Sequence, residues 1–222
     1  MPDNSGSTPP DLMTEQAYQA LIAQLRDGRL GSGTFLSMPV LVKQLELPMA
    51  AVRDAVKRAE AGGLVSVIPK RGVMIMDAGP DTTRECMELR MVFDCEGARR
   101  LIEQSEHIPL AALRDAHEEL RDAAQTQMSP ELTLRAITTD LSLHNALAAG
   151  NTSPLATRLY TENRERISII QNTRPFLANR IASAMEEHLT IISALEARDT
   201  EATLTAIRTH LRSTLVWWGI PD

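Results

Sequence analysis

Residues 50–76 have the sequence AAVRDAVKRAEAGGLVSVIPKRGVMIM and decide the fold of the N-terminal part of the chain. The apolar residues of its first ten positions recur at helical spacing, and Gly62-Gly63 ends that helix. Two apolar runs follow, Leu64–Ile68 and Val73–Met76, and they predict two strands joined by the turn Pro69-Lys70-Arg71-Gly72. The stretch therefore predicts a helix followed by a β-hairpin with two cations at its tip.

Two further amphipathic segments precede this stretch. Tyr18–Leu25 places its apolar residues at i, i+3, i+4 and i+7, and Asp27-Gly28 ends it. A shorter run, Val40–Leu45, follows Ser37, a residue type that caps helices. Two short helices joined by a tight connection and followed by a basic hairpin predict a winged helix-turn-helix in residues 14–78.

Charge is unevenly distributed along the chain. The whole chain carries a formal net charge of −6, which argues against general adhesion to polyanions. Residues 14–78, however, hold eight Lys or Arg against six Asp or Glu. The cations lie where such a fold meets DNA, and the candidate DNA-binding residues are Arg53, Lys57, Lys70, Arg71 and Gly72. A solvated helix face and an ordinary polar hairpin are the alternative interpretation.

Cysteine content and hydropathy indicate a cytoplasmic protein. The chain has two cysteines, Cys86 and Cys95, which lie in one expected helix and are too far apart there to form a disulfide. No apolar run approaches the length of about 18 residues that a membrane span needs, so no membrane partner is expected. Residues 1–13 are rich in small and polar residues and are expected to form a mobile tail.

Residues 79–222 show helical periodicity almost throughout. Six helices are expected, at 81–105, 109–126, 129–149, 153–172, 176–197 and 199–218, several of them with a proline near the start. Helices of this number and length suggest an antiparallel bundle. The predicted fold class is therefore mostly α, with a winged helix-turn-helix in front of an all-helical bundle.

Four residues of the helical part have the types and spacing of a metal site. Asp140 and His144 are four residues apart, which places both side chains on one helix face. His188 and His210 lie within two later helices. Three imidazoles and one carboxylate suit a divalent transition metal such as Zn, Ni, Mn or Fe. The same residues also fit a hydrogen-bonded surface pair and packed core histidines.

The other two histidines, His107 and His117, lie in polar stretches among acidic residues. Both are expected to face solvent rather than to take part in a site.

Segments in both halves of the chain match the pattern of a known family. In the N-terminal half they are Ile22–Leu36, Val52–Ala55, Ala61–Val65 and Pro69–Gly72. In the C-terminal half they are Leu89–Asp94, Asp140–Leu147 with Gly150-Asn151, Glu187–Ile191 and His210. With these segments the chain resembles a GntR-family bacterial transcription regulator of the FadR branch, which carries a C-terminal FCD domain. The resemblance covers nearly all of residues 14–218.

The resemblance implies a homodimeric regulator whose operator affinity is controlled by a small organic acid. It implies that Asp140, His144, His188 and His210 hold a metal, because their order and spacing resemble those of metal-binding FCD domains. Six expected helices are closer to the six-helix FCD subgroup than to the seven-helix one. Residues 79–222 would then bind the effector and dimerise.

A mechanism follows from these assignments. The dimer would place two recognition helices in successive major grooves of a pseudo-palindromic operator, with Arg53 on a guanine. Family members commonly carry Ser-Arg or Thr-Arg just before this helix, whereas the chain has Pro48 and Met49, so one guanidinium is missing. Arg90 could pair with a second acidic group of the effector, or it could form an intrahelical pair with Asp94.

Three other functions fit the same residues. A metal-dependent enzyme also uses histidines and a carboxylate, but the chain has no HExxH helix and no G-x-S-x-G elbow. No unclaimed acid is placed as a general base either, so enzymatic activity is not expected. A dedicated metal sensor would respond to the ion itself, and a metal-free domain would pack the histidines in its core.

Overall fold

The computed structural model describes residues 10–104, 108–126, 129–174 and 177–220. Their contacts form two compact units. The first, the N-terminal unit, comprises residues up to Thr82 together with Arg164–Thr173. The second, the helical unit, comprises Thr83–Asn163 and the residues from Arg174 onward.

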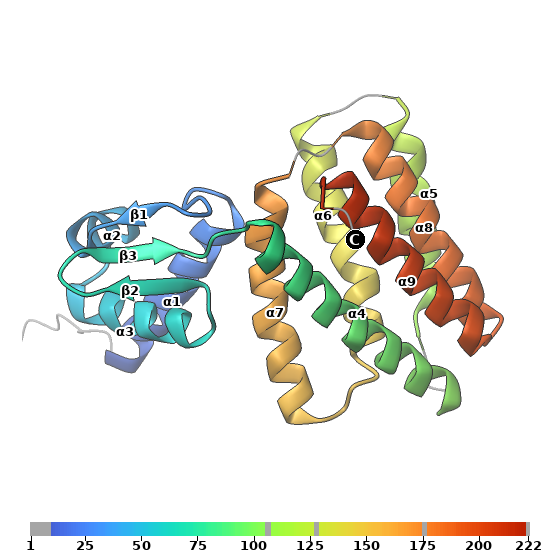
Figure 1. The fold of residues 1–222 in the computed structure, drawn as a ribbon, viewed down its shortest axis with the longest axis horizontal. Coiled ribbons are helices and arrows are strands. Elements are labelled where there is room, and N and C mark those ends of the chain that lie inside the picture. The colour runs from blue at the N-terminus through green and yellow to red at the C-terminus, as the bar shows by residue number, and fades with distance from the viewer. Residues whose placement is uncertain (1–9, 105–107, 127–128, 175–176, 221–222) are drawn as a thin grey trace, which may run out of the picture. The chain divides into compact units, whose positions relative to one another are not determined.

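The N-terminal unit is a winged helix-turn-helix, as the sequence predicts (Figure 1). Its elements are α1 (Pro10–Arg26), β1 (Phe35–Leu36), α2 (Met38–Leu45), α3 (Met49–Ala61), β2 (Val65–Ile68) and β3 (Gly72–Ile75). The strands form an antiparallel sheet in the order β1-β3-β2. Strand β1 was not predicted, because a segment of two residues is too short to show the alternation of apolar and polar residues that indicates a strand. Helix α1 begins at Pro10, so residues 10–13 belong to it rather than to the expected tail, and residues 1–9 lie outside the described residues.

Apolar faces of the three helices and of the sheet form the core of this unit. Its most buried members include Leu21, Leu25, Leu41, Val52, Leu64, Val73 and Ile75. Ser37 occupies the N-cap position of α2, but its side chain makes no capping hydrogen bond, contrary to the expectation. Gly63 follows α3 with a φ of 71°, a backbone conformation that glycine adopts without strain.

Residues 164–173 were expected to belong to the helical part, and the contacts place them in the N-terminal unit. Ile169 lies in the core of the winged helix. The Asn172 side-chain amide donates to the Leu25 carbonyl at the end of α1 (2.9 Å), and Arg166 donates to the Gly62 carbonyl after α3 (2.9 Å). This segment therefore completes the packing of the winged helix.

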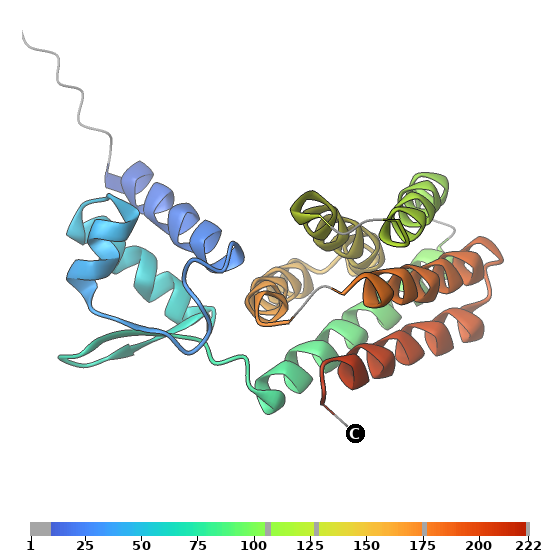
Figure 2. The same ribbon diagram turned by 90° about the horizontal axis from the view of Figure 1, so that it is seen from above.

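The helical unit consists of the six predicted helices, which form a bundle (Figure 2). They are α4 (Pro80–Glu103), α5 (Leu110–Ala124), α6 (Pro130–Ala148), α7 (Pro154–Asn172), α8 (Ala178–Glu196) and α9 (Thr200–Trp217), and each end lies within two residues of its predicted position. The first residues of α4 and the last residues of α7 belong to the N-terminal unit. Among the described helices, none has the length and apolarity required to cross a membrane.

Two glycines let the backbones of α4 and α6 approach closely. A Cβ atom at Gly97 would clash with the Leu147 carbonyl oxygen, and one at Gly150 would clash with the Gly97 carbonyl oxygen. Asn151, just after α6, donates to the Phe93 carbonyl on α4 (2.9 Å). The approach brings the middle of α4 against the end of α6 that carries His144.

Candidate metal centre and nucleic-acid interface

The structure brings all four predicted metal ligands together inside the helical unit. Asp140 and His144 come from α6, His188 from α8 and His210 from α9. One donor atom from each residue lies within 4.8 Å of the other three. The distance from His188 Nε2 to His210 Nε2 is 3.2 Å, and the distances from Asp140 Oδ1 to His188 Nε2 and His144 Nε2 are 3.6 and 3.8 Å. Three helices thus direct their donors to one point.

Two of the imidazoles are held by carboxylates. His144 Nδ1 donates to Asp94 Oδ2 on α4 (2.7 Å), and His210 Nδ1 donates to Glu187 Oε2 on α8 (2.6 Å). A neutral imidazole that donates from Nδ1 has its lone pair on Nε2, so both rings turn their Nε2 lone pairs toward the cluster. Histidine ligands of metals are commonly held in this way. Glu187 was not predicted to have this role, and Asp94 was considered only as a partner for Arg90.

His117 was expected to face solvent, and that prediction is wrong. Its side chain lies on α5 with 0% exposure, and its Nε2 is 3.1 Å from Nδ1 of His188. The prediction rested on the acidic residues next to His117 in the sequence. Leu113 and Leu120, four residues before and three after, place His117 on the apolar face of α5. His107 lies outside the described residues.

Burial keeps two of the ligand imidazoles neutral. It holds the pKa of His188 well below 6.5 and lowers the pKa of His210 to about 4. Burial also opposes ionisation of Asp140, but the neighbouring His144 and Arg90 hold the pKa of this carboxyl below its usual value. At neutral pH His188 and His210 are therefore neutral and Asp140 is a carboxylate, which are the protonation states that metal binding requires of these groups.

Arg90 lies beside this cluster with 5% exposure. Its Nη1 is 3.6 Å from Asp140 Oδ2, and its Nη2 is 3.5 Å from His210 Nε2. Asp94, the alternative partner that the sequence suggested, instead accepts from His144. The guanidinium thus adds a positive charge next to the Asp140 carboxylate, a candidate ligand.

The donor set fits a divalent transition metal. Ligands about 2.1 Å from a tetrahedral ion lie about 3.4 Å apart, close to the distances between these atoms. The buried His144 Nε2 has no hydrogen-bond partner among the described residues, which is unusual for a buried polar atom. Nε2 of His188 and Nε2 of His210 lie 3.2 Å apart, close enough for one cation to bind both. Three imidazoles and one carboxylate are ligands that Zn, Ni, Mn and Fe accept.

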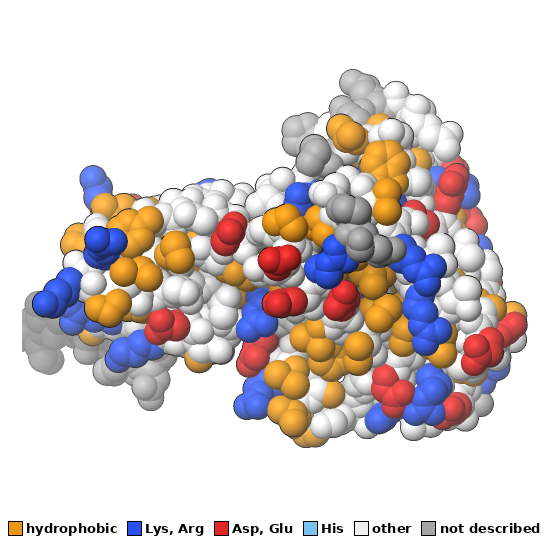
Figure 3. All heavy atoms as spheres, in the orientation of Figure 1, with side chains coloured by type: hydrophobic (Ala, Val, Ile, Leu, Met, Phe, Trp, Pro, Cys, Tyr) orange, Lys and Arg blue, Asp and Glu red, His pale blue; other side chains and the backbone are white. Residues whose placement is uncertain are grey.

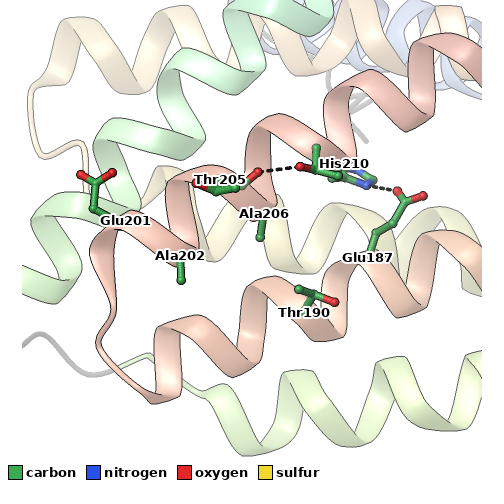
Figure 4. A pocket seen from close by; sticks show the side chains of 8 residues that line it. Glu187, Thr190, Glu201, Ala202, Thr205, Ala206 and His210 are labelled. Atoms are coloured by element: carbon green, nitrogen blue, oxygen red, sulfur yellow. Dashed lines mark hydrogen bonds and ion pairs between the residues drawn. The ribbon is translucent and has the colours of Figure 1, made fainter.

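A groove between α8 and α9 reaches the edge of the cluster. Its volume is about 460 Å³, and small side chains such as Ala202, Ala206 and Thr190 line most of it. At one end the carboxylate of Glu187 points toward the ring of His210 (Figure 4). His210 thus belongs to the cluster and also lines the groove.

The candidate DNA-binding residues lie on the surface of the N-terminal unit. Arg53 and Lys57 are exposed on α3, and Lys70 and Arg71 are exposed in the turn between β2 and β3. Gly72 follows with a φ of 146°, and a Cβ atom there would clash with the Leu36 carbonyl oxygen. Gly72 therefore has a structural reason to be glycine: it allows β3 to approach β1.

Arg58, the other cation near the end of α3, is engaged within the unit. It forms an ion pair with Glu15 (2.6 Å) and stacks over the ring of Tyr18, 3.8 Å from the ring centroid. Lys57 is paired with Asp54 at 3.1 Å, but both side chains are largely exposed.

A winged helix-turn-helix combined with an all-helical domain defines a class of DNA-binding regulator rather than an enzyme. The chain belongs to the GntR family of bacterial transcription regulators and carries an FCD domain. The FCD domain model matches residues 85–213, and the model described as bacterial regulatory proteins, gntR family, matches residues 13–75. The resemblance inferred from the sequence is thereby confirmed.

Similar proteins support this assignment. BphR of Paraburkholderia xenovorans, an uncharacterized HTH-type transcriptional regulator, is 24% identical over an alignment of 211 residues that covers 91% of this chain and 84% of BphR. The structure is similar to E. coli McbR/YncC, with a TM-score of 0.73 and 19% identity over 93% of this chain and 97% of that one. A putative GntR regulator from Rhodococcus sp. RHA1 has a TM-score of 0.74 and 22% identity, covering 94% of this chain and 99% of that one. At these identities the structures establish the fold alone.

Proposed function

We propose that a small organic acid controls the operator affinity of this regulator by binding at a divalent transition metal. The metal would be held by Asp140, His144, His188 and His210. The observation that carries the proposal is the convergence of their donor atoms within 4.8 Å in the interior of the helical unit. Zn, Ni, Mn and Fe all suit these ligands.

The effector would bind through its charged groups. When bound, the metal supplies a Lewis-acidic position for one carboxylate or hydroxyl oxygen. The guanidinium of Arg90, 3.6 Å from the ligand Asp140, is placed to receive a second acidic group through a bidentate hydrogen bond. A small dicarboxylate or hydroxycarboxylate matches both features. Its effect on DNA binding is limited to its differential affinity for the two states of the protein.

On the DNA side, Arg53 would contact a guanine edge in the major groove. Lys57, Lys70 and Arg71 would contact phosphates, and Gly72 would keep the wing turn close to the backbone or minor groove. Pro48 precedes α3 and Met49 is its first residue, where the common pair is Ser-Arg or Thr-Arg, so base preference depends more strongly on Arg53. Because operators lie on the chromosome, we infer that the protein is cytoplasmic, with no membrane partner.

A homodimer would present two such heads to a pseudo-palindromic site. The exposed face between α4 and α9 is suited to the contact between copies, and Figure 3 shows hydrophobic side chains there, flanked by charges of both signs. The apolar residues that line this α4–α9 face are Leu89 and Val92, which are exposed, Met91, which is half-buried, and Leu211 and Leu215, which are buried. Its charged residues include Glu85, Glu88, Arg208 and Arg212. Charges of both signs on one face let a two-fold contact pair acid with base.

The decisive test measures operator affinity with and without metal and carboxylates. The operator is obtained by in vitro selection, and its affinity is measured for chelator-treated protein, metal-loaded protein and metal-loaded protein with a panel of small carboxylates. Elemental analysis of protein purified without a chelator or a nickel column identifies the metal. We expect a carboxylate to change the affinity only when metal is present.

Two variants sharpen this test. Asp140→Asn removes the charged ligand and should abolish the carboxylate response, whereas Asp115→Asn, at an exposed position on α5, should leave the response intact. Protein that contains no metal and responds equally to carboxylates with and without added metal contradicts the proposal. Affinity that follows free metal alone, at fixed organic acid, identifies a dedicated metal sensor instead.

A further inference from the structure

A chain of hydrogen bonds runs from the backbone of α5 to one of the proposed ligands. His117 Nδ1 lies 2.6 Å from the Leu113 carbonyl oxygen, and His117 Nε2 lies 3.1 Å from His188 Nδ1. On its other side, His188 Nε2 lies 3.6 Å from Asp140 Oδ1. The His117 and His188 side chains along this chain are fully buried, and the Asp140 side chain at its end is 16% exposed.

The positions of the hydrogens along this chain of hydrogen bonds follow from the Leu113 carbonyl, at which it begins. A carbonyl oxygen can only accept, so His117 Nδ1 carries the hydrogen and donates it to Leu113. The neutral His117 ring then has its lone pair on Nε2, and His188 must donate to it from Nδ1. The neutral His188 ring therefore has its lone pair on Nε2, the atom that faces the other donors.

We propose that His117 is a positioning residue for metal binding, which fixes His188 in the tautomer and orientation that present Nε2 to the ion. This inference rests on the proposed metal site. His117 does not contact the metal in this assignment. It acts through His188, as Asp94 acts through His144 and Glu187 acts through His210.

His117 prevents a hydrogen bond between Nε2 of His188 and Nε2 of His210. His188 Nε2 lies only 3.2 Å from His210 Nε2, and the second atom has a lone pair because His210 donates from Nδ1 to Glu187. Without an acceptor at Nδ1, His188 would gain a hydrogen bond by moving its proton to Nε2 and donating to His210. That bond would occupy two of the metal-binding nitrogen atoms at once. An acceptor on α5 therefore keeps both nitrogen atoms available.

His117 also differs chemically from the two groups that hold the imidazoles of His144 and His210. Asp94 and Glu187 are carboxylates, which raise the basicity of the imidazoles they hold. A neutral imidazole fixes the orientation of His188 without adding a negative charge to the site. His117 therefore sets the direction of the His188 donor while leaving the charge of the site to Asp140 and the two carboxylates.

The first experiment determines the tautomers directly. Nitrogen-15 NMR of the chelator-treated, full-length protein distinguishes the protonated from the unprotonated nitrogen of each imidazole. We expect His117 and His188 both to carry their hydrogen on Nδ1. A hydrogen on Nε2 of His188 would overturn the proposal, whether or not the protein binds metal, so this result separates it from failure of the metal site.

The second experiment measures metal affinity in three variants. His117→Leu removes the acceptor and should weaken Zn²⁺ binding about 10- to 100-fold, measured by competition with a chromophoric chelator. His117→Gln places an amide oxygen near the position of Nε2 and should restore most of the affinity. Co²⁺ titration should show altered visible absorption in the Leu variant and near-parental absorption in the Gln variant.

Leu120→Ala is the matched control, because Leu120 is fully buried on the same helix but belongs to a separate apolar cluster. It should lower the stability of the bundle and leave Zn²⁺ affinity nearly unchanged. Equal Zn²⁺ affinity in His117→Leu and the parent would overturn the proposal. So would an equal loss in Leu120→Ala, since the effect would then come from the packing of α5 in general.

Discussion

A buried imidazole that stays neutral makes protein stability depend on pH, and His210 is the clearest case in this chain. Its pKa is lowered to about 4, mainly by burial, from an ordinary value of 6.5. Below pH 6.5 the unfolded chain takes up a proton that native His210 does not accept, so the free energy of unfolding falls as the pH falls toward 4. A difference of this size corresponds to about 3 kcal/mol at most.

This prediction is measured by urea unfolding of chelator-treated protein across that pH range. His210→Asn removes the titrating group and should make the decline shallower. The carboxyls of Asp140 and Glu187, whose pKa values are lowered from 3.8 and 4.5, contribute in the same direction only as the pH falls below those ordinary values, because the unfolded chain then takes up protons that the native carboxylates do not. If the free energy of unfolding of the His210→Asn variant declines as steeply as that of the parent, His210 is not the group responsible for the pH dependence.

Two cations of α3 should have different effects on DNA binding. Replacing Arg53 by Ala should cost about 1–3 kcal/mol of operator affinity and relax the preference at one base position. Replacing Lys57 by Ala should weaken binding to all sequences alike and reduce the salt dependence by about one unit of slope. Arg58→Ala is the control, because Arg58 is held by Glu15 and Tyr18, and it should leave base preference unchanged. Unchanged selectivity in Arg53→Ala would show that another residue reads the base.

At the scale of elements, the close approach of α4 and α6 supports the candidate metal centre. Ala is about 1 kcal/mol more favourable than Gly within a helix, so Gly97→Ala would ordinarily stabilise α4. Here its Cβ would clash with the Leu147 carbonyl, and overpacking of this kind costs about 1–3 kcal/mol. The shift of α4 would also move Asp94, one turn earlier, away from His144.

We therefore expect Gly97→Ala to lower both the free energy of unfolding and the affinity for Zn²⁺. Gly79→Ala is the control, because the nearest atom to a Cβ there is the Asp77 carboxylate at 3.4 Å, an ordinary contact. A Gly97→Ala protein as stable as the parent, with equal Zn²⁺ affinity, would show that α4 does not support the site in this way.

For the molecule as a whole, the assembly state should depend on the α4–α9 face. Val92 on this face is 55% exposed, so Val92→Glu should leave the fold of one copy intact and convert the proposed homodimer to a monomer. Operator affinity should fall with it, because a monomer lacks the second DNA-binding head. Sedimentation measures the assembly state. Leu134→Glu, at a residue that is 67% exposed on α6 and does not line this face, should remain dimeric.

Most of the fold could be predicted because helices depend on local spacing. The apolar period and the glycines or prolines near their ends placed all six helices of the helical unit within two residues. Strand β1 could not be predicted from local sequence, because its two residues form a strand by pairing with β3, which is distant along the chain. Residues 164–173 group with the winged helix for the same reason, because the residues of the core in which Ile169 lies are more than 90 positions away along the chain.

In the candidate site, too, some features could be predicted from local sequence and others only from the tertiary structure. Residue type, the i, i+4 spacing of Asp140 and His144, and the placement of His188 and His210 within later helices were sufficient to select the four candidates, and the family pattern then supported the set. Their convergence, the carboxylates that hold two of the rings and the burial of His117 between α5 and α8 came only from the packed bundle. The reason is physical: a helix determines which of its own residues share a face, but the packing of several helices determines what that face meets.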